Sequence, residues 1–267
     1  MTRSGYYDAV VLSLRSFGEG HREVRLLAEG RGLLRAAVFG GAKSKLKSLA
    51  APWHSGRIWL YENPVKNTIK VTDFDVTAFR PSLRENLFKT WAASLCTELV
   101  VRTGGGEGND SKSLFPLVCG FLDGLDIAGE HEGRAGLLRF LWRWLILMGL
   151  DPDPELCIRC GAATRCEAPA RCEAPAGTNR ENGVLYYSAY EGGFICGNCS
   201  RPEERVFPAD EAVRGYLSAV SRLPPAAVRV LPLRGDTVRD MKNLLFFLAE
   251  KAVDGRLNTL QSGVGIL

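Results

Sequence analysis

The chain has 267 residues, of which 46% are hydrophobic and 24% are charged. This length indicates two or three structural modules, and the composition is sufficient for buried cores. No run of about eighteen apolar residues occurs, which argues against a membrane-spanning helix. The N-terminus also lacks the charged-then-apolar pattern of a secretion signal, so we expect a cytosolic protein that does not interact with membranes.

Positive charge is concentrated in the first part of the chain. The formal net charge is +4, yet residues 1–80 carry 13 Lys and Arg against 7 Asp and Glu, a net charge of +6. The remaining residues therefore have a net charge of −2. A basic N-terminal module is a modest signature of a polyanionic partner, although a solvated basic surface would produce the same count.

The first eighty residues have the alternating pattern of short β-strands. Five are predicted, at 7–14, 22–27, 33–39, 56–61 and 68–76. The segments between them contain turn residues, such as Gly30 and Gly32 after the second strand and Pro64 after the fourth. Five short strands in a basic module predict an OB-fold β-barrel, and an SH3-like barrel remains the alternative.

A Gly-Gly-Ala-Lys-Ser-Lys-Leu-Lys segment at 40–47 separates the third and fourth predicted strands. Lysines at alternate positions beside glycines can lie along a phosphate backbone, and the P-loop pattern is absent. Trp53, Trp59 and Tyr61 could serve as stacking platforms, although the alternation around Trp59 favours a core position. The predicted nucleic-acid contacts are Lys43, Lys45, Lys47, Arg57, Lys66 and Lys70.

After Pro81 the pattern becomes helical. Ser82 is a potential N-cap for a helix that continues to Val100, and further helices are predicted at 114–127 and 133–148. The third is apolar on nearly all sides, as in a buried helix or one that forms a partner groove. Arg139 and Arg143 share one of its faces and could receive an acidic peptide, with solvated arginines as the alternative. Two more helices are predicted, at 210–223 and from Thr237 to Val253.

Two Cys-x-x-Cys pairs, Cys157 with Cys160 and Cys196 with Cys199, have the spacing of zinc knuckles. Four thiolates leave Zn²⁺ no open position for water, so one structural zinc ion per chain is expected. Free core cysteines or a redox dithiol are the alternatives, and disulfides are disfavoured in a cytosolic chain. Between the pairs lies a tandem Arg-Cys-Glu-Ala-Pro-Ala duplication, whose Cys166 and Cys172 we interpret as spare.

Two enzyme classes fit the sequence poorly. A zinc deaminase combines His-x-Glu with Pro-Cys-x-x-Cys, and the sequence His21-Arg22-Glu23 lies in the predicted barrel while neither knuckle has that form. A metal-dependent nuclease needs clustered carboxylates, whereas Asp151 and Asp153 flank Pro152 in a linker. We therefore expect no catalytic residues. The non-enzymatic alternative is a zinc-containing RNA-binding or transcription-associated factor.

The order of these features resembles the RecO family of bacterial recombination mediators over essentially the whole chain. The resemblance lies in the Gly-Gly-x-Lys-Ser-Lys loop and above all in the passage from Leu137 through Met148-Gly149-Leu150-Asp151-Pro152 to the first knuckle. It implies a non-enzymatic DNA-repair protein with an OB-fold, a helical domain and a four-cysteine zinc finger. The boundaries we expect are 1–80 for the barrel, 81–153 with 200–267 for the helices, and 154–199 for the finger.

The same resemblance implies specific partners. RecO proteins bind single- and double-stranded DNA and anneal complementary strands, in the cytoplasm and near the nucleoid. With RecR they help to load RecA onto DNA coated by single-stranded-DNA-binding protein (SSB), whose C-terminal tail binds the helical domain. Carried over to this sequence, the loop of Lys43 to Lys47 would contact DNA and Cys157, Cys160, Cys196 and Cys199 would bind zinc. The duplicated insert departs from the family pattern.

Overall fold

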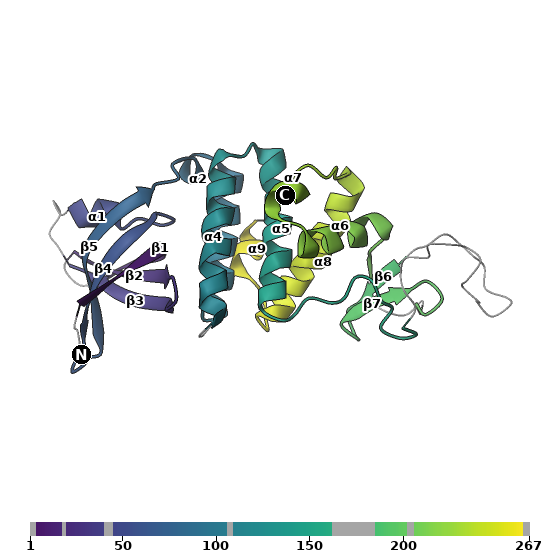
Figure 1. Ribbon diagram of the computed structural model, residues 1–267, viewed down its shortest axis with the longest axis horizontal. Helices are drawn as coiled ribbons and strands as arrows, with labels where there is room; N and C mark the ends of the chain where they lie inside the picture. Colours follow the sequence, from purple (N-terminus) through teal and green to yellow (C-terminus); the bar gives the residue numbers. More distant parts are fainter. Residues whose placement is uncertain are drawn as a thin grey trace. The chain divides into compact units, whose positions relative to one another are not determined.

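The computed structural model describes residues 4–17, 20–39, 45–105, 109–161, 185–201 and 206–263. A five-stranded barrel comes first, helices follow, and a small sheet lies beside the cysteine knuckles, so the α+β fold expected from the sequence is confirmed (Figure 1). The chain divides into two compact units, one of Met1–Leu137 with Gly255–Leu267 and one of Leu138–Asp254. The three-domain division expected from the sequence remains a prediction.

The barrel consists of β1 (Ser4–Phe17), β2 (His21–Ala28), β3 (Gly32–Val38), β4 (Ser55–Asn63) and β5 (Thr68–Ala78). It closes in the order β1-β2-β3-β5-β4, with β4 returning to β1. Only the β3–β5 pairing is parallel, through Ala37 and Lys70. The short helix α1 (Lys45–Leu49) lies between β3 and β4. These features agree with the OB-type Greek-key barrel.

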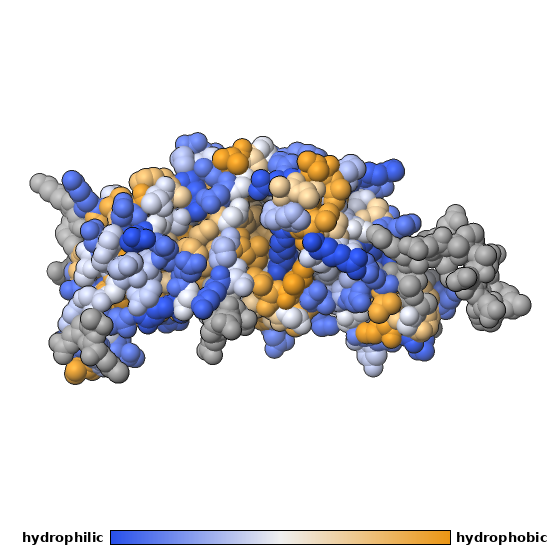
Figure 2. All heavy atoms as spheres, viewed as in Figure 1, coloured by the Kyte–Doolittle hydropathy of each residue, from blue (hydrophilic) through white to orange (hydrophobic). Residues whose placement is uncertain are grey.

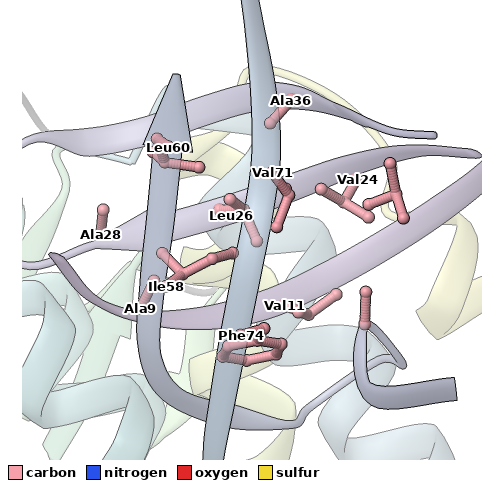
Figure 3. Packing of buried hydrophobic residues seen from close by; sticks show 12 residues of the cluster. Ala9, Val11, Val24, Leu26, Ala28, Ala36, Ile58, Leu60, Val71 and Phe74 are labelled. Carbon is pink, nitrogen blue, oxygen red and sulfur yellow. The ribbon is translucent and has the colours of Figure 1, made fainter. Parts of the chain in front are cut away.

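Alternating side chains form the barrel core because successive residues of a strand point to opposite faces. Val24 and Leu26 of β2 and Ile58 and Leu60 of β4 are at most 1% exposed, and Figure 3 shows these side chains converging with Val71 and Phe74 of β5. Each such aliphatic side chain contributes roughly 1.5–3 kcal/mol by leaving water. The core therefore fixes which residues of each strand face outward.

The two tryptophans of this module lie in different environments. Trp59 lies between two fully buried residues of β4, which puts it on the outer face, where its ring lies 6.5 Å from that of Tyr6. Trp53 is only 8% exposed, and its indole N–H donates to Thr97 Oγ1 at 3.1 Å. The prediction that Trp59 is a core residue was therefore wrong, because the strand parity is set by Ile58 and Leu60. Trp53 is the residue that cannot serve as a stacking platform.

Besides α1, the described helices of the first unit are α2 (Ser82–Glu85), α3 (Leu87–Arg102), α4 (Asn109–Ile127), the first part of α5 (Glu130–Leu147) and α9 (Asn258–Ser262). The single helix expected from Ser82 is in fact two, because Asn86 adopts an extended conformation and accepts from the N–H of Lys89 at 3.0 Å. The Ser82 hydroxyl instead donates to the carbonyl of Asp126 at 2.6 Å.

Helix α9 is held against α3 by polar contacts. Glu98 accepts hydrogen bonds from the backbone N–H groups of Asn258 and Thr259 at 2.8 Å and from the Thr259 hydroxyl at 2.6 Å. The Trp91 indole donates to the Thr259 carbonyl at 2.7 Å. Burial favours a higher pKa for Glu98, but these hydrogen bonds outweigh it and hold the pKa below its ordinary value.

Among its described residues, the second unit holds the rest of α5, a three-stranded sheet and three helices. The sheet has the order β7-β6-β8, and the sequence analysis did not predict it. Helix α6 begins after Asp210, which caps it by accepting from the N–H of Val213 at 2.8 Å. The strands are β6 (Leu185–Ser188), β7 (Gly193–Cys196) and β8 (Val206–Pro208), and the helices are α6 (Glu211–Arg222), α7 (Pro225–Arg229) and α8 (Gly235–Ala252).

Helix α8 begins at Gly235, two residues before the predicted cap Thr237. Its Phe247 packs against the sheet, with ring centroids 4.7 Å from Phe207 and 6.2 Å from Tyr187. This aromatic cluster attaches the sheet to a long helix. Among the residues described, none of the helices has the length and apolar character needed to cross a membrane.

Candidate metal centre and nucleic-acid interface

The structure brings the two cysteine pairs together. The sulfur atoms of Cys157, Cys160, Cys196 and Cys199 all lie within 4.8 Å of one another, and those of Cys160 and Cys196 are 3.9 Å apart. Four sulfurs at 2.3 Å from a tetrahedral zinc ion would be separated by about 3.8 Å. This donor set can therefore hold a metal ion.

The local backbone explains how the first pair reaches the second. Gly161 adopts a left-handed φ of 69°, and its N–H donates to the Cys157 carbonyl at 2.8 Å, which closes the turn. Ile158, which follows Cys157 in this turn, donates its N–H to the Phe194 carbonyl of β7 at 2.9 Å. A Cβ atom at Gly193 would lie 2.7 Å from Ile158 Cδ1, so this close approach requires glycine.

The electrostatics of the four sulfurs favour a bound cation. Burial opposes ionisation of Cys157, but backbone N–H groups of Cys160, Cys196 and Arg159 outweigh it and lower its pKa to about 6. The Cys196 N–H lies 3.4 Å from the Cys157 sulfur. Burial and the neighbouring sulfurs raise the pKa values of Cys196 and Cys199. A central cation would remove this repulsion and stabilise all four thiolates.

Arg159 is a residue that the sequence analysis did not single out. Its Nε donates to both carboxylate oxygens of Glu191, at 2.9 and 3.0 Å, and its Nη1 donates to the carbonyl of Cys199. The side chain thus joins the first knuckle to the β6–β7 turn and to the second knuckle. Only its place inside a Cys-x-x-Cys pair could have drawn attention to it. The spare cysteines, Cys166 and Cys172, lie outside the described residues.

Helix α1 replaces the extended loop expected for the lysines. Lys45 is exposed on this helix, and Lys47 is partly buried, with its carbonyl accepting from Arg22 Nη1 at 2.8 Å. Residues two apart on a helix do not share a face, so the alternate spacing does not align these ammonium groups. Lys43 lies outside the described residues.

The other three predicted contacts are separated on the barrel. Lys66 is exposed in the turn between β4 and β5, and Lys70 is exposed on β5 with its ammonium 4.7 Å from the ring centre of Phe39. Arg57 lies on β4, over the Tyr6 ring and 3.5 Å from an oxygen of Asp8. Arg57 already has a carboxylate partner, which makes it less suited to bind phosphate than the exposed lysines Lys66 and Lys70.

Arg139 and Arg143 lie in the second unit on the same side of α5. Arg139 is only 8% exposed and donates to the Tyr216 hydroxyl at 3.3 Å, so it is not a solvated arginine. Arg143 is half-buried and donates to the Leu223 carbonyl at 3.1 Å. Burial lowers the pKa of Arg143, and the charges of Arg139 and Arg229 lower it further. Three cations close together form a local positive field.

Known proteins that resemble this chain in sequence are DNA repair proteins. The family model described as "Recombination protein O C terminal" matches residues 84–168, which runs from α2 through α5 and past the first knuckle. DNA repair protein RecO of Anaeromyxobacter dehalogenans (strain 2CP-C) is 28% identical over 257 residues, covering 93% of this chain and 91% of that protein. The chain is similar to DNA repair proteins RecO over most of its length.

Other RecO proteins show how far the similarity extends. The Bacillus pumilus (strain SAFR-032) protein is 26% identical over 231 residues, covering 85% of this chain and 75% of the relative. The Myxococcus xanthus (strain DK1622) protein is 32% identical over 162 residues, covering 58% of this chain and 63% of the relative. The resemblance to RecO drawn from the sequence is thus confirmed. Figure 2 shows hydrophobic residues at the surface around the β7 part of the chain. Ile158, whose N–H donates to Phe194 of β7, is about half exposed.

Proposed function

We propose that this chain is a non-enzymatic recombination mediator that acts in DNA repair. It binds single- and double-stranded DNA, anneals complementary strands and, with RecR, helps to load RecA on DNA coated by SSB. Its place of action would be the nucleoid. The observation that carries the proposal is the five-stranded OB-type barrel, which bears the basic part of a chain similar to DNA repair proteins RecO over most of its length.

The metal in this proposal is one structural zinc ion per chain. Four sulfur donors favour zinc over harder cations, and a complete thiolate shell leaves no position for a reacting water molecule. When bound, the ion would neutralise the thiolates and tie the knuckles to the β6–β7 hairpin. The role proposed for the protein requires it to hold DNA strands and proteins together and does not require it to break bonds.

A second binding surface is proposed for the acidic, apolar C-terminal tail of SSB. Arg139 and Arg143 supply positive charge. Leu223, the residue after the C-terminus of α6, is 41% exposed and accepts a hydrogen bond from Arg143 through its carbonyl. A half-buried arginine whose nearest charges are also positive gains most from an added carboxylate. The terminal carboxylate of the tail would form an ion pair with Arg143, and the apolar residues of the tail would pack against Leu223.

The decisive experiment follows annealing of two complementary DNA strands that are coated with SSB and carry a fluorescent donor and acceptor. We expect the purified chain to raise the annealing rate at least tenfold. An unchanged annealing rate would reject the proposal. If the chain instead bound structured RNA more tightly than either form of DNA, the zinc-containing RNA-binding or transcription-associated factor would be the better description.

A further inference from the structure

The four cysteines of the cluster differ in how far solvent reaches them. Cys160 is exposed, Cys196 and Cys199 are partly buried, and Cys157 is only 1% exposed. An oxidant must reach a thiolate in order to react with it, so exposure helps to decide which cysteine of a cluster is oxidised first. Among these four residues, Cys160 is therefore the first target of a small oxidant in solution.

The contacts of the sulfur atoms lead to the same residue. The Cys157 sulfur accepts a hydrogen bond from the backbone N–H of Cys196 at 3.4 Å, which stabilises its negative charge and makes it a weaker nucleophile. The Cys160 sulfur lies 3.9 Å from the Cys196 sulfur, on the other knuckle. The sulfurs of a disulfide are about 2 Å apart, so a closing movement of about 2 Å would join this pair.

The described cysteines outside the cluster are poorer targets. Cys96 of α3 is only 1% exposed, and burial raises its pKa. Burial also raises the pKa of Cys119 on α4 to about 11. Both side chains are therefore thiols at neutral pH, and the thiolate is the form that an oxidant attacks. The strands of the barrel contain no cysteine. Among the described residues, oxidation is thus directed to the cluster.

We propose that the cysteine cluster is an oxidation site, at which a peroxide joins Cys160 to Cys196 in a disulfide and the metal ion is released. The inference rests on the zinc site of the proposed function and adds the regulation of that site. Cys160 is the residue that meets the oxidant, and Cys196 is the residue that resolves the oxidised product. Disulfides that form in cytosolic proteins are usually transient and redox-sensing, which suits this role.

The chemistry requires two steps. With hydrogen peroxide as the oxidant, the Cys160 thiolate attacks one oxygen, the O–O bond breaks, and a sulfenic acid and a hydroxide ion form. The Cys196 thiolate then attacks the sulfenic sulfur, the S–S bond forms, and the S–O bond breaks to release a second hydroxide ion. Each sulfur loses one electron, and the two oxygens of the peroxide gain both. Cys157 and Cys199 remain as thiolates, and two ligands are too few for a structural zinc site.

The effect on the protein should be local, because separate contacts hold the neighbouring helix. Glu155, in the linker before the first knuckle, accepts from Ser218 Oγ at 2.8 Å and from Arg222 Nη2 at 2.6 Å, so the linker stays attached to α6. The β6–β7 hairpin is joined to the first knuckle through the N–H of Ile158, which donates to the Phe194 carbonyl. Oxidation should therefore loosen the hairpin and leave α6 unchanged.

The first test uses the full chain, reduced and loaded with zinc. Hydrogen peroxide is added in the presence of a coloured zinc chelator, and the disulfide is then located by peptide mapping. We expect zinc release, a Cys160–Cys196 disulfide, and faster amide hydrogen exchange in the β6–β7 hairpin but not in α6. A dithiol reductant with added zinc should restore the starting state, since disulfides are reversible. A disulfide between another pair of cysteines would overturn the inference.

Two histidine variants distinguish Cys160 from its neighbours. Three cysteines with one histidine are an ordinary structural zinc set, so Cys160→His and the matched control Cys199→His should both keep the ion. Release by peroxide should be about tenfold slower in Cys160→His, which lacks the exposed thiolate, and within about twofold of the unaltered chain in Cys199→His. Equal release rates in the two variants would contradict the role of Cys160. If either variant fails to bind zinc, the disulfide map of the unaltered chain decides.

The unaltered chain separates this inference from the proposed function. A purified chain that contains no zinc, even after zinc is supplied to the reduced protein, would remove the zinc site of the proposed function. A chain that contains zinc and keeps it in the presence of excess hydrogen peroxide would overturn the inference and leave the proposed function standing.

Discussion

Arg159 and Glu191 form an ion pair beside the cysteine cluster, with Arg159 Nε 2.9 and 3.0 Å from the two carboxylate oxygens. Both residues are largely shielded, the Arg159 side chain at 15% exposure and that of Glu191 at 30%. Because Arg159 also donates to the Cys199 carbonyl, the pair fixes the distance between the knuckles. Protein contacts thus help to hold the cysteine cluster together.

Removing this contact should weaken metal binding. Arg159→Ala leaves all four sulfurs in place but releases the second knuckle from the first, and loss of a supporting residue of this kind typically costs 10–100-fold in metal affinity. Competition for zinc with a coloured chelator measures the affinity. Arg159→Lys should recover part of the loss, and Arg239→Ala, an exposed arginine of α8, should have no effect. Equal affinities for Arg159→Ala and the unaltered chain would contradict this role.

Elemental analysis should find one zinc ion per chain. Cys157→Ser with Cys196→Ser removes one ligand from each knuckle, so the ion should be lost and the thermal unfolding midpoint should fall. The sheet beside the knuckles has three strands of at most four residues, so a bound metal should add to its rigidity. Cys166→Ser with Cys172→Ser is the matched control and should retain the zinc. Loss of zinc from that control would show that the duplicated insert supplies ligands.

Glu98 should stabilise the chain in a pH-dependent manner. Its pKa is lowered in the folded state, so its contribution is fully present above the unfolded value near 4.3 and is lost as the pH falls through the lower folded pKa. Glu98→Gln should therefore reduce the free energy of unfolding by about 1 kcal/mol at pH 7, a modest figure because the group is partly exposed. The difference should shrink as the pH falls below about 4.3 and through the lower folded pKa. Chemical denaturation at several pH values measures it, and a constant difference would exclude the charge as the cause.

The lysines before and within α1 give a separate prediction. If Lys43, Lys45 and Lys47 all contact phosphate, exchanging them for Ala should lower the slope of log affinity against log salt concentration for single-stranded DNA by about 2. If only some of them do, the reduction should be smaller, and Lys45 and Lys47 do not share a helix face. Binding of a fluorescent oligonucleotide at several salt concentrations measures the slope. An unchanged slope would reject the lysines as a binding site.

Arg143 should control binding of an acidic tail. Arg143→Glu reverses the charge of the more accessible arginine on this side of α5 and should weaken binding of a peptide that ends in acidic and apolar residues by at least tenfold. Calorimetric titration of the full chain measures the affinity. Arg239→Glu is the matched charge reversal on α8 and should bind normally. Arg139 is a poorer target, because its burial against Tyr216 makes misfolding of a variant an alternative explanation. Normal binding by Arg143→Glu would reject the site.

The strands and long helices were predictable because their patterns are local. Alternation in β2 and β4 and caps such as Asp210 fix those elements within a few residues. The break at Asn86 was missed because both Ser82 and Asn86 are good caps, and only packing against Asp126 decides between them. The sheet of β6 to β8 was missed because its strands are short and separated by a long insert.

The candidate sites also differ in how far local sequence could predict them. The cysteine cluster was predictable because its spacing within each pair carries the geometry of the turn. The outward position of Trp59 was not, since a one-residue difference in strand parity exchanges core and surface. Arg159 meets Glu191 only through the fold of the hairpin.

Binding of a fluorescent single-stranded oligonucleotide by the unaltered chain, followed as the salt concentration rises, tests the central claim most directly. The account predicts tight binding at low ionic strength and a linear fall of log affinity with log salt concentration, with a slope that reports several phosphate contacts. The absence of binding at low ionic strength, or an affinity that does not depend on salt, would contradict it.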